Sequence, residues 1–404
     1  MTIEYDRLAD AELDGFVECF CTALGFRLTG KQREAFDQFV ERDRMRVLRD
    51  QGQVVGTLGA HSLKMVVPGG TCNVAGTTLV GVLPTHRRRG LLRKFIEHHL
   101  SEVHALGEPL AALWASEGSI YGQFGYGLAT ERTAWKIPRT FAALHEGKGN
   151  AGECRLVDAD EAFAEFPQIH DSQRDCRPGF LYRRAAWWSN RILSESHPAF
   201  GDVALRRILY SIDGSPSGYA IYHTSRQDSE GGLQLHVREV CARDEDSERS
   251  IWQCLTSVDL VESIHCWNLP ADHPLRWWLK DVQKSSRTIA AGMWLRIISV
   301  ETALTARHYR GRGRLVLEVH DEQCPWNCGR FQLEVHEDGT AECTRTSDSP
   351  DIVVPISALS SVYLGNFSWE DQRRCGAVSG APDRVQLADA IFSWEPAAWC
   401  PERF

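Results

Sequence analysis

The chain has 404 residues, of which 43% are hydrophobic and 25% charged, with a formal net charge of −9 at pH 7. This length predicts two or three domains of ordinary globular composition, and the negative charge argues against nucleic acid as a main partner. No apolar run reaches the ~18 residues that span a bilayer, and residues 1–16 are acidic without a secretory signal. We therefore expect a cytoplasmic protein with no membrane span.

The 13 cysteines are scattered along the chain. Without a secretory signal, this pattern predicts buried or reduced thiols and no disulfide framework. Cys324 and Cys328 are the nearest approach to a metal-binding pair, but no second pair follows at ligand spacing. Structural zinc normally takes four ligands, so the sequence predicts no metal site.

The first segment, residues 1–138, predicts a mixed α/β domain. Apolar residues recur at helical spacing over residues 10–24 and 31–41. A third helix pattern, also amphipathic, begins at Gly90 and ends near Gly107. The expected strands cover residues 45–48, 54–58, 62–67, 77–83 and 110–114.

The second segment, residues 139–290, alternates strands and helices in an order that echoes the first. It includes an expected helix over residues 245–261 but no arginine-rich turn. We therefore predict an internal duplication whose second copy has lost the cofactor. The third segment, residues 291–404, predicts an α+β domain. Its expected strands cover 292–297, 314–319 and 330–337, and its helices 355–363 and 384–392.

The most informative stretch, residues 79–92, reads LVGVLPTHRRRGLL. It predicts a strand, a short turn and a helix that begins at Gly90. The first-turn N–H groups of a helix lack intrahelical partners, and with the helix dipole they form an anion site. Three arginines, Arg87 to Arg89, add positive charge, so a diphosphate is the natural occupant. No Walker loop or dinucleotide fingerprint is present. The alternative is a solvated basic helix start.

A second motif, residues 113–127, reads LWASEGSIYGQFGYG. Together the two motifs resemble the GCN5-related acetyltransferases. The resemblance implies that Val80, Gly81 and Val82 pair with the pantetheine arm of acetyl-CoA and that Tyr121 protonates the departing thiolate. Tyr126 would then be a packing residue, with exchanged roles as the alternative. The remaining cofactor-binding residues implied are Arg88, Arg89, Gly90, Leu91, Leu92, Arg93, Ser116 and Glu117, although Glu117 could instead cap a helix at Gly118.

The combination of PTHRRRGLL with WASEGSIYGQFGYG more closely resembles the Eis (enhanced intracellular survival) acetyltransferases. The segments 324–330, 356–359 and 363–365 resemble that family's last domain. The resemblance implies two acetyltransferase-like domains followed by a sterol-carrier-like domain, in a homohexamer. It also implies acetylation of aminoglycoside-like or polyamine amines. The general base would be the C-terminal carboxylate of Phe404. Burial beside its own ring would raise the pKa of this weak base.

Three further functional alternatives stay open from the sequence. The acceptor could be a protein lysine or a peptide, or the chain could be a hydrophobic-ligand carrier with a degenerate acetyltransferase domain. A cysteine could also accept the acetyl group first, which would give ping-pong kinetics, but neither motif contains a cysteine. We therefore expect direct attack of the amine in a ternary complex.

Overall fold

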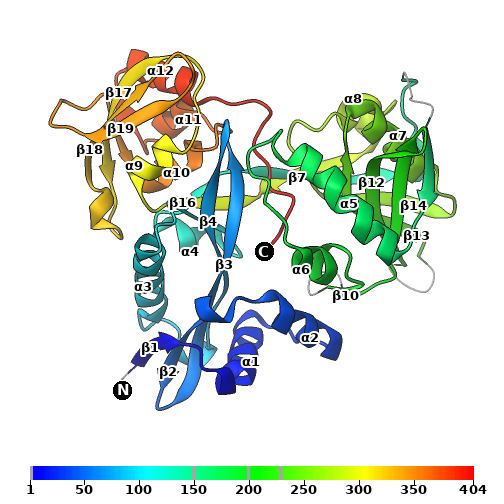
Figure 1. Cartoon of the computed structure of the whole chain (residues 1–404), viewed down its shortest axis with the longest axis horizontal. Helices are drawn as coiled ribbons and strands as arrows, with labels where there is room; N and C mark the ends of the chain where they lie inside the picture. The colour runs from blue at the N-terminus through cyan, green and yellow to red at the C-terminus, as the bar shows by residue number, and fades with distance from the viewer. Residues whose placement is uncertain (1–2, 148–151, 198–200, 227–230) are drawn as a thin grey trace. The chain divides into compact units, whose positions relative to one another are not determined.

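The computed structural model describes residues 3–147, 152–197, 201–226 and 231–404. The chain divides into two compact units (Figure 1). The first unit contains Met1–Thr29, Val40–Thr130 and Gly292–Phe404, and the second contains Gly30–Phe39 and Glu131–Ala291. Among the described residues, no helix is both long and apolar enough to cross a membrane.

A seven-stranded sheet lies in the first unit. In sheet order its strands are β1 (Ile3–Arg7), β2 (Arg46–Asp50), β3 (Gln53–Val67), β4 (Gly70–Val82), β5 (Leu110–Trp114), β16 (Met293–Ile297) and β6 (Gly127–Leu128). All neighbours pair antiparallel except β4 and β5, which run parallel. The two expected runs at 54–58 and 62–67 form one strand, because residues 59–61 continue the ladder with β4.

Helices cover both faces of this sheet: α1 (Leu13–Leu24) and α3 (Leu91–Ala105). Val82 on β4 shares a buried cluster with Leu91 and Phe95 of α3. The next residue back, Gly81, faces α1, because a Cβ built on it would lie 2.8 Å from the Cβ of Ala23. Alternate residues of a strand point to opposite faces, so α1 and α3 pack on opposite sides of β4.

The first unit also contains a five-stranded sheet. In order its strands are β19 (Ala341–Arg345), β18 (Gly329–Val335), β17 (Gly313–His320), β20 (Ile352–Pro355) and β21 (Ser379–Gly380). Its helices are α9 (Val300–Thr305), α10 (Ile356–Val362), α11 (Trp369–Arg374) and α12 (Pro382–Phe392). Helix α10 packs against β16 and β6, which joins this domain to the first sheet.

A buried ion pair fixes that junction. Arg296 on β16 donates from Nη2 to both carboxylate oxygens of Asp321 at 2.7 and 2.8 Å, and both side chains are fully buried. Arg296 Nε also donates to the carbonyl of Phe124 at 2.8 Å. The backbone N–H of Cys324 donates to Asp321 Oδ1 at 3.0 Å. The turn at Cys324 and Cys328 is thus organised around a carboxylate.

Replacing Asp321 with alanine is expected to lower the free energy of unfolding by roughly 3–5 kcal/mol, because the Arg296 guanidinium would lose its buried counter-charge. Equilibrium denaturation measures this change. The control is Asp348→Ala, which removes a half-exposed partner of Arg314 in the same domain and should cost less than about 1 kcal/mol. Equal losses for the two variants would contradict this account of the junction.

The second unit has its own seven-stranded sheet. In order its strands are β15 (Ser286–Ala291), β7 (Glu131–Pro138), β14 (Val261–Leu269), β13 (Leu233–Ala242), β12 (Ser215–Arg226), β11 (Arg206–Ile212) and β8 (Gly152–Leu156). The other elements include α2 (Gly30–Phe39), α5 (Ala159–Arg174), α6 (Ala185–Trp187), η5 (Trp188–Ile192), α7 (Glu245–Ser257), α8 (Leu275–Trp278) and the antiparallel pair of β9 (Ser196–His197) and β10 (Gly201–Asp202).

This sheet also carries helices on both faces (Figure 1). Tyr219 on β12 packs with Phe166 of α5, whereas Tyr222 packs with Trp252 of α7. As in the first domain, the single parallel pair, β13 with β14, is connected by a helix, here α7. The second domain therefore repeats the order of the first, with β13, α7 and β14 in the places of β4, α3 and β5.

Four elements differ from the sequence expectation. Strand β7 lies within residues 1–138 but pairs in the second sheet, and β16 lies in the third segment but completes the first sheet. Helix α2 groups with the second unit. The helix expected over 245–261 ends at Ser257, because Val258 is extended and Val261 begins β14.

Candidate active site

The parallel strands β4 and β5 separate after a short paired stretch. They pair only where Val74–Gly76 faces Leu110–Ala112. Beyond this point β4 continues to Val82 and β5 to Trp114, and neither pairs with the other in the described ladder. The opposite edge of β4 stays bonded to β3. The edge of β4 that faces β5 can therefore pair with an extended ligand, as an exposed strand edge does.

Val80, Gly81 and Val82 lie on β4 beyond this separation. Just before them, Leu79 has φ of 55°, in the left-handed region, and a register shift interrupts the β3–β4 ladder between Thr57 and Gly59. Thr57 Oγ1 donates to the carbonyl of Leu79 at 2.8 Å and holds this conformation. Such bulges re-aim strand residues beside functional sites.

The start of α3 lies directly after β4. Gly90 is its N-cap residue with φ of 74°, a conformation that suits glycine, and no side chain caps the helix. The N–H groups of the first turn are therefore available to an anion, and the positive end of the helix dipole adds to the attraction. Leu91 and Leu92 anchor this turn in the core.

The arginines beside this turn differ in role. Arg87 supports the turn, because it donates to the carbonyl of Ala23 at 2.6 Å and to that of Val82 at 3.2 Å. Arg88, Arg89 and Arg93 are exposed. Arg88 has φ of 61°, and Arg89 Nη2 donates to the carbonyl of Thr85 at 3.0 Å. The guanidinium of Arg93 lies 5.8 Å from the ring centre of Phe124.

Ser116 and Glu117 lie at the end of β5, before α4 (Gly118–Gly122), and both are exposed. Glu117 occupies the N-cap position of α4, but its side chain makes no capping hydrogen bond. The structure therefore gives no support to the alternative that Glu117 serves only as a helix cap, because the capping hydrogen bond is not formed.

Tyr121 on α4 is buried in the cluster that also contains Val82 and Leu91. Burial raises the pKa of its phenol to about 12. A raised pKa means that the phenol keeps its proton at neutral and moderately alkaline pH, as a proton donor must. Among the described residues, its hydroxyl has no hydrogen-bond partner. The sequence motif therefore places a protonated phenol beside the separated strands.

Tyr126 is held in a different way. Its hydroxyl lies 3.1 Å from Thr77 Oγ1, which also lies 2.9 Å from His99 Nε2. Burial, with smaller contributions from Arg44 and Arg46, lowers the pKa of His99 to about 3, so this histidine is neutral. The rings of Tyr121 and Tyr126 make an edge contact with centroids 5.9 Å apart. Tyr126 thus supports Tyr121 through a fully buried network.

Phe404 lies in the same region, although it is the last residue of the chain. It is 9% exposed, and a Cβ built on Gly76 would lie 3.3 Å from its Cδ2 atom. Gly76 is the last β4 residue paired with β5, and its neighbour Thr77 bonds Tyr126. The ring of Phe404 is therefore located where the two strands begin to separate.

Sequence reasoning did not identify Gly76, Thr77 or His99. A glycine inside a strand often marks a close approach of another group, so Gly76 carried a usable signal. His99 lies on the apolar stripe of α3, where a histidine is as easily read as a core residue. Its partner Thr77 gives no sequence signal, since threonine is common in strands.

In the second domain, the helix that follows the corresponding strand begins differently. Helix α7 has Asp244 as its N-cap residue, and Asp244 Oδ1 accepts from the N–H of Ser247 at 2.8 Å. Glu245, Asp246 and Glu248 add negative charge to the first turn. A capped, acidic helix start repels a diphosphate, in contrast to the uncapped start of α3.

The domains that known protein families share with this chain agree with this geometry. Residues 4–129 and 179–297 match acetyltransferase (GNAT) domain families, and residues 300–401 match a sterol carrier protein domain. The N-acetyltransferase Eis of Mycobacterium tuberculosis is 37% identical over 78% of this chain and 76% of its own. An uncharacterized N-acetyltransferase of Streptomyces avermitilis is 30% identical over 94% of each chain. The chain belongs to the Eis family of N-acetyltransferases.

The solved structure of Eis1 from Mycobacterium abscessus is 30% identical and superposes over all of both chains with a TM-score of 0.85. This Eis-family member therefore has two GCN5-related acetyltransferase domains and a sterol-carrier-like domain, and the predicted fold class is confirmed. It is an acetyltransferase enzyme.

The Eis fold implies the use of acetyl-CoA, and the residues present fit this group. The uncapped start of α3 suits a diphosphate, and the unpaired edge of β4 suits the amide-containing pantetheine arm. The activated thioester would supply the acetyl group.

Proposed function

We propose that this N-acetyltransferase uses acetyl-CoA to acetylate amines of small cationic acceptors, of the aminoglycoside or polyamine type, by direct attack in a ternary complex. The main support is that three features lie along the same pair of strands, β4 and β5, in the first unit. These are the separation of β4 from β5, the uncapped start of α3, and the approach of Tyr121 and Phe404 to the paired end of the strands.

In this proposal two groups of the chain transfer protons, one as an acceptor and one as a donor. The α-carboxylate of Phe404 accepts a proton from the acceptor ammonium, and the neutral amine forms the new N–C bond as the C–S bond breaks. Tyr121 donates its phenolic proton to the departing sulfur, and the proton that the new amide nitrogen then releases restores the phenol. A pKa of about 12 keeps that proton in place until the sulfur develops charge. None of the chain's 13 cysteines lies in the two motifs, which favours direct transfer.

The cationic acceptor class is supported by charge. The chain carries a net charge of −9. We further propose that only the first domain binds the coenzyme, because the acidic start of α7 opposes a diphosphate. The homohexamer and the cytoplasmic location stay predictions from the sequence.

An acceptor panel tests this proposal. The protein is incubated with acetyl-CoA and one acceptor at a time, either spermidine, kanamycin or a lysine peptide. The products are identified by mass spectrometry. Acetylated spermidine or kanamycin with little peptide product is expected. Faster acetylation of the peptide would overturn the acceptor class, and no product from any amine would favour the carrier alternative.

A further inference from the structure

A cavity of about 510 Å³ lies on the sheet of the second unit. This volume falls within the roughly 300–1,000 Å³ of typical small-molecule sites. The walls are formed mainly by strands β7, β12, β13, β14 and β15, and none of the described residues that line it is acidic.

Five lining residues form a row straight across the sheet. His223 on β12 is opposite His236 on β13, which is opposite His265 on β14. His265 is opposite Lys136 on β7, and Lys136 is opposite Ser286 on β15. Residues directly opposite on neighbouring strands project from the same face. The row therefore presents three imidazoles, an ammonium group and a hydroxyl to one cavity.

The imidazoles stack instead of converging. Ring centroids of His223 and His236 are 4.8 Å apart with planes 10° from parallel, and those of His236 and His265 are 5.1 Å apart at 31°. Ser225 Oγ lies 2.8 Å from His236 Nε2 and helps to hold the central ring. Within the described chain, no group of histidine, cysteine or acidic side chains is arranged to hold a metal ion. The stack is thus a polar platform.

Arg238 adds a second cation beside the row. It is the extra residue of a bulge in β13, where Ile221 pairs with Glu239 and Tyr222 with Val237. Burial and the nearby Arg191 and Arg207 lower the pKa of Arg238 to about 10, which still leaves it charged at neutral pH. With Lys136 and Arg238 lining the cavity and no lining carboxylate, the field in the cavity favours an anion.

The cavity occupies the second domain's counterpart of the strand separation. Strands β13 and β14 pair up to Val237 and Cys266, after which β14 pairs only with β7. Both residues line the cavity, with Arg238 and Trp267 from the stretches beyond. The duplicated domain thus keeps a pocket where the first domain has its gap. The capped, acidic start of α7 excludes a coenzyme diphosphate, so the occupant is smaller.

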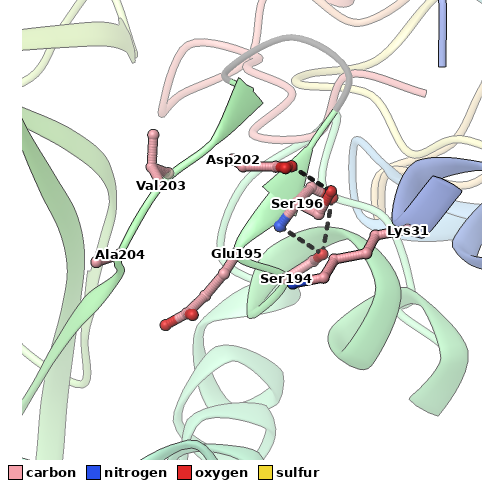
Figure 2. Close-up of a pocket in the computed structure, with 7 residues that line it drawn as sticks. All are labelled: Lys31, Ser194, Glu195, Ser196, Asp202, Val203 and Ala204. Atoms are coloured by element: carbon pink, nitrogen blue, oxygen red, sulfur yellow. Dashed lines mark hydrogen bonds between the residues drawn. The ribbon is translucent and has the colours of Figure 1, made fainter. Parts of the chain in front are cut away.

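A neighbouring cavity of about 440 Å³, shown in Figure 2, is a weaker candidate. Its polar groups bond one another: Ser196 Oγ donates to Asp202 Oδ1 at 2.5 Å, and Ser194 Oγ donates to the carbonyl of Ser196 at 2.8 Å. Lys31 lies among the lining residues with the acidic Glu195 and Asp202, so the lining carries charges of both signs.

We propose that the cavity on β7, β12, β13, β14 and β15 binds a small organic anion, with a carboxylate or phosphate group held by Lys136, Arg238 and the histidine row. The remaining volume is lined in part by Trp267, so the rest of the ligand carries a flat, apolar group. All residues that line this site belong to the second unit, so the proposal does not rest on the acetyl-transfer residues of the first unit.

Binding at this site should strengthen as pH falls. Burial lowers the pKa of all three histidines, that of His223 to about 4, and further lowering comes from His236 and Arg238 on His223 and from His236 and Lys136 on His265. The rings are therefore neutral when no anion is present at neutral pH. An anion raises the pKa of a neighbouring histidine, so binding takes up protons and tightens below about pH 7.

Calorimetric titration of the full chain with benzoate, phenyl phosphate and neutral benzyl alcohol tests the proposal. One or both anions should bind, and more tightly at about pH 6 than at about pH 8, whereas benzyl alcohol should not. Which anion binds better distinguishes carboxylate from phosphate. Lys136→Gln should weaken binding about tenfold, the equivalent of ~1.4 kcal/mol. His236→Gln should reduce the pH dependence, because only His223 and His265 of the row would remain.

Two control variants test whether the effect of Lys136→Gln is specific to the cavity. Lys280→Gln removes an exposed lysine of the second unit that does not line the cavity, and His320→Gln removes a histidine of the third domain. Neither should change the affinity. Equal binding of benzyl alcohol, unchanged binding in Lys136→Gln, or no binding of either anion would overturn the proposal. Acetylation measured alongside should be the same in Lys136→Gln and the wild type, so the outcome is independent of the proposed function.

Discussion

Replacing Tyr121 with phenylalanine is expected to lower kcat roughly 10²–10⁴-fold, the range typical of general acid–base groups. The substitution removes one oxygen atom from a ring that is otherwise packed in the core of the first domain. Because the α3 start and the β4 edge are unchanged, the affinity for acetyl-CoA should stay within a few-fold of the wild type. Steady-state kinetics and calorimetric titration with acetyl-CoA measure the two effects separately.

The pH profile gives a second test of the same residue. Because burial raises the pKa of Tyr121 to about 12, the phenol is protonated across the accessible range and loses its proton only above it. In the wild type, kcat should therefore show no alkaline decline up to about pH 10 from this group. A decline centred near the ordinary tyrosine pKa would show that the phenol is not shielded in the working enzyme.

Tyr126→Phe is the matched control. Its hydroxyl is bonded to Thr77 within the fully buried network, so its loss should cost about 1 kcal/mol of stability while turnover falls by less than about tenfold. If Tyr126→Phe lost more turnover than Tyr121→Phe, the roles of the two tyrosines would be exchanged. Unchanged turnover in Tyr121→Phe would remove it from the mechanism.

Extending the chain beyond Phe404 by Gly-Ser-Gly should abolish measurable acetyl transfer. The extension converts the α-carboxylate into a neutral peptide group and moves the charge away from the ring that packs at Gly76. No other feature of the coenzyme site is altered, so the thermal stabilisation by acetyl-CoA should remain, about 2.7 kcal/mol at 100 times the Kd. A coupled assay of thiol release measures turnover.

The same tripeptide added at the N-terminus is the control for this variant, and it should leave turnover unchanged. Deletion of Phe404 is a second test, because it moves the carboxylate back to Arg403 and removes the ring. We expect it to be as inactive as the extended chain. Full activity in the extended protein would show that the terminal carboxylate is not the base.

The sequence predicted the elements whose signals are local. The strand, arginine-rich turn and helix of residues 79–92 are contiguous, so hydrogen bonding and apolar spacing within a few residues are enough to predict them. The structure shows β4 ending at Val82 and α3 beginning at Leu91 after the glycine cap. Tyr121 could be named because its motif spacing resembles that of a known family.

The rest depends on contacts between distant segments. Strand β16 joins the first sheet and β7 the second, which no composition change in the chain marks. The Arg296–Asp321 pair connects residues whose sequence neighbours give no hint of complete burial. The histidine row needs the register of five strands, and a shift of one residue in any of them would send its side chain to the opposite face.

The comparison of the two domains explains why one fold can carry different ligands. Both have a parallel strand pair that separates and a helix between the two strands. In the first domain the helix start is uncapped and flanked by arginines, and in the second it is capped and acidic. The chemistry of each pocket is therefore set by a few side chains on a common backbone arrangement.

A crystal structure of the wild-type protein with acetyl-CoA tests the central claim most directly. We predict that the diphosphate accepts hydrogen bonds from the first-turn N–H groups of α3 and that the pantetheine arm pairs with β4 near Val80 to Val82. The thioester should then lie between Tyr121 and the carboxylate of Phe404. Coenzyme bound between β13 and β14 of the second domain, with the α3 start left without a phosphate, would contradict the account.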